Sequence, residues 1–345
     1  MKISLRHRRT LGRLALLACG ALLLTLVLDE FFGFQLWSYD KIVPLQPLDD
    51  GDTRFDRRAV VRNMLHAPAA RLVHQTWRTA LVRPDQAGYV SSWAAQNPGY
   101  TYVFWDDVDS RLLVSTFFAD FLPTYNAYST PVQRADAARY LLMEVFGGIY
   151  ADMDFEATRP FDDLLGAHQI AVAPEPPAHW LLYGGEPLLC NAIILSRRRH
   201  PFWAFMRKAL TEAFSALGSA ADTLSLTGPT VFNSAINAWR RESGRPKSDQ
   251  ISVLAPDTFY PIVAKWNTKI AEQCAVAVAD GRTRTNICAD NFTANTHAVH
   301  HWSFSWGRAG RKKQSALPLR ELVPESIPGR QLIEIMMSEA DQEAR

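Results

Sequence analysis

The eight residues 147–154, GGIYADMD, constrain the fold of this chain more than any other segment. A pair of glycines favours the end of a helix, because glycine adopts the left-handed conformation without steric cost. Residues 149–151 then predict a short buried strand, and Asp152 and Asp154 follow where that strand leaves its sheet. Two carboxylates so placed suit Mg²⁺, Mn²⁺ or Ca²⁺. The segment therefore predicts a helix–strand unit that ends in a cation site.

A calcium-binding EF-hand loop is the competing interpretation of the acidic residues at 152, 154 and 156. That loop needs a glycine at its sixth position and a glutamate at its twelfth. Ala157 and Asp163 stand at those positions here. The residues before the acidic pair also predict a strand rather than a helix, so this interpretation is set aside.

The residues before the two glycines predict a helix from Pro131 to Phe146. Thr130 is a suitable N-cap, and Gln133 completes a capping box. Asp136 and Arg139 are three residues apart and share one face of this helix. An isolated pair of this kind is usually an ordinary surface ion pair. Next to the Asp-x-Asp carboxylates, however, Asp136 can accept hydrogen bonds from sugar hydroxyls, and the Arg139 guanidinium can bind phosphate. The segment thus predicts a site for a diphosphate sugar.

Strands alternate with helices from residue 71 to residue 306, which predicts an α/β domain with a mainly parallel sheet. The expected strands are 71–77, 100–105, 149–151, 169–173, 191–196, 251–254 and 297–301. The expected helices are 86–96, pieces of 106–128 around Pro123, 131–146, 201–217 and 229–239. The net charge of +2 over 345 residues excludes the strongly basic surface of a nucleic-acid-binding protein, so no nucleic-acid partner is expected.

The pattern of the N-terminal segment indicates a membrane anchor. Five basic residues precede an uncharged apolar run at 14–28. A cleaved signal peptide is the alternative, since the run is short for a full span of about 20 residues. The apolar character continues through Phe31, Phe32, Phe34, Leu36 and Trp37, interrupted only by the acidic pair at 29–30, and no small-x-small cleavage site follows Leu28. We therefore predict a cytoplasmic tail at 1–13, a signal-anchor transmembrane helix at 14–34 and a stem at 35–70, with the remainder lumenal.

The rest of the chain agrees with a lumenal domain at 71–306 followed by a C-terminal tail at 307–345. Cys274 and Cys288 would pair across a short loop in an oxidising compartment, which leaves Cys190 as a buried thiol. Asn291 begins an Asn-x-Thr glycosylation pattern. Within the tail, residues 332–336 can form one amphipathic helical face, which we expect to dock on the domain.

Three segments together resemble the Asp-x-Asp sugar-binding glycosyltransferases of family 32: residues 131–154, HQTW at 74–77 and NPGY at 97–100. That family includes inositol phosphoceramide mannosyltransferases and the initiating α-1,6-mannosyltransferase of N-glycans. Residues 131–154 are also similar to the corresponding part of the large clostridial glucosylating toxins. The resemblance implies a GT-A (Rossmann-like) fold, a nucleotide-sugar donor, Mn²⁺ (or Mg²⁺) and retention of anomeric configuration.

The resemblance also implies roles for individual residues. Asp154 and Asp152 would bind the metal, and Asp152 would also contact the donor. Asp136 and Arg139 would grip the donor sugar and its phosphates. The segment 298–306 resembles a closing element of the family, in which His300 or His301 would complete the metal ligands and Trp306 would cover the diphosphate. Satisfied core histidines are the alternative there. The other residues expected to bind substrate are His74, Gln75, Thr76, Trp77, Arg134, Tyr140, Gly148 and Asn191.

The expected function is transfer of mannose from GDP-mannose to a glycolipid or glycan acceptor, by a single-pass type II protein of the Golgi membrane. A galactosyl- or glucosyltransferase that uses a UDP-sugar is one alternative. A non-catalytic sugar-binding protein of the same fold is another, although the four intact residues at 136, 139, 152 and 154 argue against it. The acceptor stays open at this level.

Overall fold

The computed structural model describes residues 44–48, 56, 59–60, 67, 69–242, 244–264, 267–279, 287–303 and 315–343. The predicted tail at 1–13, the predicted anchor at 14–34, most of the predicted stem and Trp306 lie outside these ranges. Within the described ranges, no helix combines the length and apolar character that a membrane span requires.

A seven-stranded sheet in the order β11-β3-β1-β4-β7-β6-β8 organises the fold. Six strands run in one direction, and only β7 is antiparallel to its neighbours. The predicted α/β domain with a mainly parallel sheet is therefore confirmed. The strands of this sheet are β1 (Leu72–Thr76), β3 (Thr101–Trp105), β4 (Gly148–Ala151), β6 (Ile170–Val172), β7 (Ile193–Ser196), β8 (Ile251–Val253) and β11 (Ile327–Pro328).

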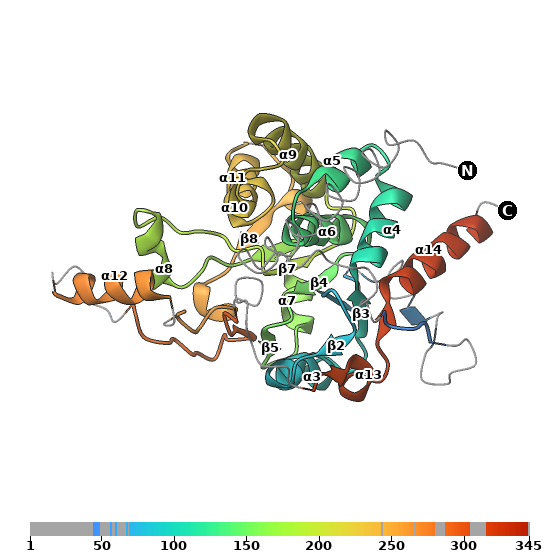
Figure 1. Cartoon of the computed structure of the whole chain (residues 1–345), viewed down its shortest axis with the longest axis horizontal. Helices are drawn as coiled ribbons and strands as arrows, with labels where there is room; N and C mark the ends of the chain where they lie inside the picture. The colour runs from blue at the N-terminus through green and yellow to red at the C-terminus, as the bar shows by residue number, and fades with distance from the viewer. Residues whose placement is uncertain are drawn as a thin grey trace, which may run out of the picture. The chain divides into compact units, whose positions relative to one another are not determined.

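Helices cover both faces of this sheet. Successive strand residues point to opposite faces, so Val103 and Ile194 belong to one buried apolar layer while Phe104 and Ile193 belong to another. Figure 1 shows α6, α9 and α11 on one side of the sheet and α3 and α13 on the other. Strands buried on both faces explain the nearly continuous apolar runs in the sequence. The helices of eight or more residues are α3 (Ala87–Gln96), α4 (Asp107–Phe117), α6 (Pro131–Val145), α9 (Phe202–Leu217), α11 (Pro229–Arg241), α12 (Thr268–Ala279) and α14 (Gly329–Glu343).

Shorter elements complete the described structure. Two-stranded sheets pair β2 (Leu81–Val82) with β10 (Leu317–Pro318) and β5 (Phe155–Ala157) with β9 (Ala298–His300). The short helices are α5 (Leu122–Ala127), α7 (Asp162–Ala167), α8 (Pro177–Trp180), α10 (Thr223–Leu226) and α13 (Leu319–Leu322). The expectation that the strand near residues 297–301 would belong to the central sheet is wrong, because β9 pairs with β5 instead.

The C-terminal segment is built into the domain. Strand β11 pairs with β3 at one edge of the sheet, and Leu332, Ile333 and Ile335 of α14 are buried, which confirms the predicted docking. Part of the predicted stem lies against the same helix. The backbone N–H of Leu48 donates to Gln331 Oε1 (3.0 Å), and Gln331 Nε2 donates back to the Leu48 carbonyl (2.8 Å).

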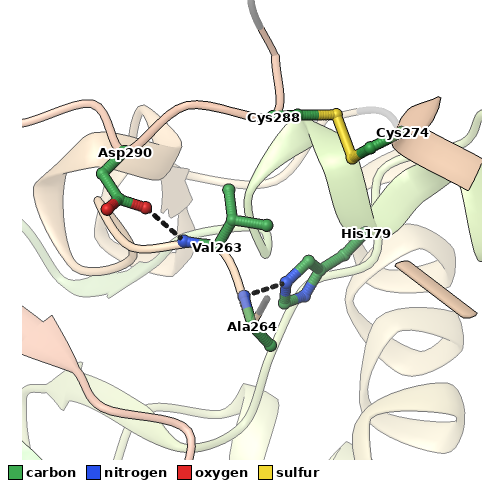
Figure 2. Close-up of a disulfide and its surroundings, with 6 residues drawn as sticks. All are labelled: His179, Val263, Ala264, Cys274, Cys288 and Asp290. Carbon is green, nitrogen blue, oxygen red and sulfur yellow. Dashed lines mark hydrogen bonds between the residues drawn. A yellow bond between two sulfur atoms is a disulfide. The ribbon is translucent and has the colours of Figure 1, made fainter. Parts of the chain in front are cut away.

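A small apolar cluster forms apart from the main core, around a disulfide between Cys274 and Cys288. Figure 2 shows this disulfide above the backbone at Val263 and Ala264. Cys190 is a free, buried thiol. The disulfide ties helix α12 to the loop that leads back towards β9.

Candidate functional site

The carboxyl ends of β1, β3 and β4 meet at one edge of the sheet, because these strands are parallel. The register aligns His74 with Tyr150, which brings the end of β1 level with the Asp-x-Asp segment. Gln75 Nε2 donates to the carbonyl of Asp152 (3.0 Å), and the Thr76 hydroxyl lies 2.9 Å from the Tyr150 hydroxyl. In open α/β sheets, ligands bind in the crevice beyond this edge. The topology therefore brings together two sequence segments that were predicted separately.

The two glycines at the start of β4, Gly147 just before it and Gly148 as its first residue, set the direction in which the chain enters the sheet. Gly147 and Gly148 have φ of +65° and +92°, a region that side chains other than glycine rarely occupy. A Cβ at Gly148 would lie 2.7 Å from the carbonyl oxygen of Leu72. Gly148 opens β4 whereas Asp152 follows its other end, so Gly148 fixes the turn and lies away from the acidic residues.

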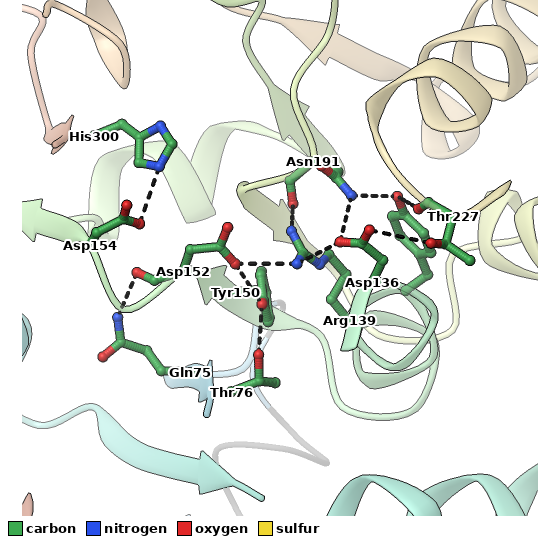
Figure 3. Close-up of polar contacts among 11 residues, drawn as sticks. Gln75, Thr76, Asp136, Arg139, Tyr150, Asp152, Asp154, Asn191, Thr227 and His300 are labelled. Atoms are coloured by element: carbon green, nitrogen blue, oxygen red, sulfur yellow. Dashed lines mark hydrogen bonds and ion pairs between the residues drawn. The ribbon is translucent and has the colours of Figure 1, made fainter. Parts of the chain in front are cut away.

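Arg139 is the centre of a buried ion-pair network (Figure 3). Its Nη2 lies 2.7 Å from Asp136 Oδ1 and 3.3 Å from Asp152 Oδ1, while its Nη1 donates to the carbonyl of Asn191 (2.8 Å). The guanidinium also stacks 4.7 Å above the ring of Tyr150. The Tyr150 hydroxyl donates to Asp152 Oδ1 (2.7 Å). One arginine thus joins α6, the end of β4 and the start of β7.

Two further segments, at Asn191 and Thr227, hold Asp136. Asn191 Nδ2 donates to its Oδ1 (3.3 Å) and the Thr227 hydroxyl donates to its Oδ2 (3.3 Å). Asn191 also donates to the Tyr140 hydroxyl (2.8 Å), which in turn donates to the carbonyl of Thr227 (2.8 Å). Burial raises the pKa of Asp136 to about 6, although the Arg139 guanidinium opposes this. Asn191 and Tyr140, both predicted to bind substrate, therefore orient Asp136 in this structure.

Asp152, Asp154 and His300 form a candidate metal centre. Each offers one ligand atom, and these atoms all lie within 4.8 Å of one another. His300 Nε2 lies 3.1 Å from Asp154 Oδ1, and the backbone N–H of Ser303 donates to Asp154 Oδ2 (2.8 Å). Burial works to raise the pKa of Asp154, but the nearby His300 and the two hydrogen bonds outweigh it and hold that pKa at about 2. The two carboxylates suit Mn²⁺ or Mg²⁺, and the imidazole favours the transition metal Mn²⁺ over Mg²⁺, which prefers oxygen ligands.

The two neighbouring histidines lie in different surroundings. His301 Nε2 lies 2.9 Å from Glu156 Oε2, and its ring stacks on Tyr89 with centroids 3.8 Å apart. His300 is therefore the member of the predicted pair that the structure places with the two aspartates. Adjacent strand residues point to opposite sides, which separates the two side chains.

Three other predicted residues lie outside this cluster. His74 is fully buried and has both ring nitrogens engaged: Trp105 Nε1 donates to Nδ1 (3.1 Å), so the other nitrogen, Nε2, donates to the carbonyl of Gly147 (3.0 Å). His74 thus supports the glycine turn. Arg134 donates to the carbonyl of Tyr128 (2.6 Å). Trp77 follows β1, and its backbone N–H donates to the carbonyl of Trp105 (3.1 Å).

The predicted glycosylation acceptor Asn291 is exposed.

Two contributors to the site were not predicted. Tyr150 lies within the GGIYADMD segment, and its spacing of two from Asp152 could have indicated that the two share a side of the strand. Ser303 contributes only its backbone N–H. No residue-type signal could have revealed that contact, because it depends on how the chain turns after β9.

Comparison with known proteins confirms the predicted resemblance. Residues 84–171 match the family described as a glycosyltransferase sugar-binding region containing a DXD motif. Inositol phosphoceramide mannosyltransferase 3 of Schizosaccharomyces pombe is 28% identical over 194 residues, which cover 56% of this chain and 52% of that protein. Mannosyl phosphorylinositol ceramide synthase CSH1 of Saccharomyces cerevisiae is 26% identical over 215 residues, covering 57% and 53%. The chain thus spans about half the length of the curated relatives it matches.

Among solved structures, the PaToxG glycosyltransferase aligns with 69% of this chain and 90% of its own, at 15% identity and a TM-score of 0.39.

Proposed function

We propose that this chain, whose residues 84–171 carry a glycosyltransferase sugar-binding region, is a metal-dependent retaining glycosyltransferase of the GT-A class. The observation that carries the proposal is the convergence, at one sheet edge, of the Asp152–Asp154–His300 cluster and the buried pair of Asp136 and Arg139. The proposed reaction moves mannose from GDP-mannose to a glycolipid or glycan acceptor. Two relatives are named inositol phosphoceramide mannosyltransferase 3 and mannosyl phosphorylinositol ceramide synthase CSH1, and these names support a mannosyl donor and a glycolipid acceptor.

Each residue has a proposed part in that reaction. Asp152, Asp154 and His300 would hold the divalent cation, which when bound offsets negative charge on the leaving diphosphate. The Asp152 side chain is 32% exposed, whereas those of Asp136 and Arg139 are 8% and 6% exposed. Asp152 is therefore the member of the network that a donor would meet first. Arg139 keeps the Asp152 carboxylate in place, and Asp136 balances the positive charge that Arg139 brings into a buried position.

Figure 3 shows how the two halves of the proposed site meet at Asp152, with His300 and Asp154 on one side and Arg139 and Asp136 on the other. A nucleotide sugar has the matching division, since its diphosphate binds a cation and its hexose presents hydroxyls. The proposed pose therefore places the diphosphate at Asp154 and the hexose towards Asp136 and Asn191.

We further propose that the protein works in the Golgi lumen as a type II membrane protein anchored by residues 14–34. The apolar run in the sequence and the Cys274–Cys288 disulfide support this location, because disulfides persist in oxidising compartments. N-terminal sequencing of protein purified from secretory membranes tests the anchor. A new N-terminus after residue 28 would show cleavage and contradict it.

The Asp154→Asn variant tests the metal assignment. Loss of one metal-binding carboxylate should lower Mn²⁺-dependent release of GDP from GDP-mannose by at least about 100-fold, with an unchanged circular dichroism spectrum. Asp162→Asn is the matched control, since Asp162 is a half-exposed partner of Arg71 away from the cluster, and its turnover should equal that of the wild type. Undiminished turnover of Asp154→Asn would refute the assignment.

A thermal-shift screen tests the donor. A ligand that binds only the folded state raises the midpoint of unfolding. GDP-mannose with Mn²⁺ should raise it more than UDP-galactose, UDP-glucose or UDP-GlcNAc with Mn²⁺, and GDP-mannose without Mn²⁺ should have little effect. If a UDP-sugar raised the midpoint more than GDP-mannose did, that UDP-sugar would be assigned as the donor instead. If no nucleotide sugar raised the midpoint, the proposed function would be contradicted.

A further inference from the structure

Trp302 has a backbone conformation that tryptophan rarely adopts. Its φ is +49°, in the left-handed region that a bulky side chain enters only when its surroundings impose it. The residues around it have an unusual arrangement as a result. His300, two residues before, and Ser303, one residue after, both bind the carboxylate of Asp154, one to each oxygen. The turn at Trp302 is what allows one short segment to grip both oxygens.

Several contacts hold the indole in place. Its Nε1–H donates to the carbonyl of Ile262 (2.7 Å). The indole ring lies 4.6 Å from that of His179, 4.1 Å from that of His300 and 5.7 Å from that of Tyr260, between ring centroids. Trp302 packs against both the main core and the small apolar cluster around the disulfide. It therefore contacts both this outlying cluster and His300 of the candidate metal centre.

The segment that receives the indole is itself fixed on two sides (Figure 2). The Ala264 N–H donates to His179 Nε2 (3.0 Å), so this nitrogen is an acceptor and the proton of His179 lies on Nδ1, where Glu175 accepts it (2.8 Å). On the other side, Asp290 Oδ1 accepts from the N–H of Val263 (3.1 Å). Asp290 lies two residues after Cys288, which the disulfide holds. The backbone that accepts the Trp302 hydrogen bond therefore has little freedom to move.

We infer that Trp302 is a positioning residue for the proposed cation site: its indole, seated on residues 262–264 and His179, maintains the strained turn that keeps His300 and the Ser303 N–H on Asp154. The inference rests on the proposed function, because it concerns the same metal centre. It also gives the buried Glu175–His179 pair and the disulfide a role, which is to support the residue that shapes the site. Without the indole, the turn relaxes and the ligands lose their mutual arrangement.

The decisive variant is Trp302→Gly, which tolerates the positive φ but removes the indole. Calorimetric titration of the metal-free protein with Mn²⁺ should show an affinity at least about tenfold lower than that of the wild type, as for other residues that orient metal ligands. Trp302→Phe keeps an aromatic ring but loses the Nε1–H bond and part of the ring packing, so its affinity should lie between that of the wild type and that of Trp302→Gly. Wild-type affinity in Trp302→Gly would overturn the inference.

Trp239→Phe is the matched control. Trp239 is buried whereas Trp302 is partly buried, and the Trp239 Nε1–H also donates to a backbone carbonyl, that of Asp249 (2.9 Å). Within the described residues, no contact joins Trp239 to the candidate metal centre. This variant should lose stability and keep the wild-type Mn²⁺ affinity. Equal loss of affinity in Trp239→Phe and Trp302→Phe would mean that the effect is general destabilisation, and would overturn the inference.

Amide hydrogen exchange separates this inference from the proposed function. In the metal-free protein, exchange of the Ser303 amide should be at least about tenfold faster in Trp302→Gly than in the wild type, because opening its bond to Asp154 becomes easier. Trp239→Phe should leave the ratio near one. If the wild type bound no Mn²⁺, the proposed metal-dependent function would fail, and the Ser303 exchange rates would still decide whether Trp302 holds the turn.

Discussion

At Gly148, the absence of a side chain lets the backbone pass close to Leu72 of β1, four residues before Asp152. Gly148→Ala should lower the free energy of unfolding by about 1–3 kcal/mol, since φ is +92° and the new Cβ would meet the Leu72 carbonyl. Urea unfolding measures this. Gly88→Ala is the control: Gly88 lies in α3 with nothing within 4 Å of its virtual Cβ, so it should gain about 0.5–1 kcal/mol. Equal effects of the two variants would contradict the steric argument.

His74 should make the stability of the protein depend on pH. Burial lowers its pKa from 6.5 to about 4, against the opposing effect of the bond to the Gly147 carbonyl. Between these values the unfolded chain binds the proton and the folded protein does not, so the contribution of His74 to the free energy of unfolding should rise with pH from about 4 to about 6.5. The slope from His74 is at most about 1.4 kcal/mol per pH unit. The pKa of Asp136, which burial raises to about 6, acts in the opposite direction over most of this range, so the contribution of His74 is measured as a difference between the wild type and a variant.

The variant His74→Gln checks that origin, because glutamine can replace both hydrogen bonds and does not titrate. The urea midpoint of the wild type minus that of the variant, measured at several pH values across this window, should increase with pH. Identical slopes would assign the dependence to other groups, such as the buried His200, whose pKa burial also lowers to about 4.

Sequence reasoning succeeded at single residues where chain neighbours determine the geometry. Asp136 and Arg139 pair as their helical spacing predicted, because i,i+3 residues share a face whatever the tertiary fold. It could not assign the metal-side histidine, since His300 and His301 are equivalent in residue type. Only the pairing of β9 with β5 decides which ring faces Asp154.

At the scale of elements, helix α6 carries half of the proposed site and begins at a complete capping box. The Thr130 hydroxyl accepts from the Gln133 N–H (3.2 Å), and Gln133 Oε1 accepts from the Thr130 N–H (3.2 Å). Thr130→Ala should cost about 1 kcal/mol of unfolding free energy by chemical denaturation. Thr211→Ala, at an exposed position within α9, should stay within about 0.5 kcal/mol. A neutral Thr130→Ala would show that tertiary packing alone fixes the start of α6.

Elements with a strong local pattern were predicted closely, and the weak ones were missed. The expected helix at 131–146 is α6, and the expected strand at 100–105 is β3. Strand β11 has two residues, too few for any period to show, and one of them is a proline that only an edge position tolerates. The pattern of β9 identified a strand but could not identify its partner, which depends on contacts far along the chain.

At the scale of the whole molecule, the C-terminal helix α14 closes one face of the sheet. Leu332 is fully buried against that face. Leu332→Ala should therefore cost about 2–5 kcal/mol, the usual range for a cavity left by a deleted leucine side chain. Met337, 43% exposed on the same helix, provides the control, and Met337→Ala should change stability by less than about 0.5 kcal/mol. Denaturant unfolding followed by fluorescence measures both, and a neutral Leu332→Ala would mean that α14 is dispensable.

The docking of residues 44–48 and strand β11 has a consequence for synthesis on the ribosome. Leu48 and Gln331 bond to each other across 283 positions of sequence, so the first of these residues emerges long before its partner exists. Until residues 327–343 have been translated, β3 is an open sheet edge with unpaired backbone groups. Such an edge can accept a strand from another chain. We therefore expect nascent chains arrested before residue 327 to be the form of this protein that chaperones engage and that aggregates.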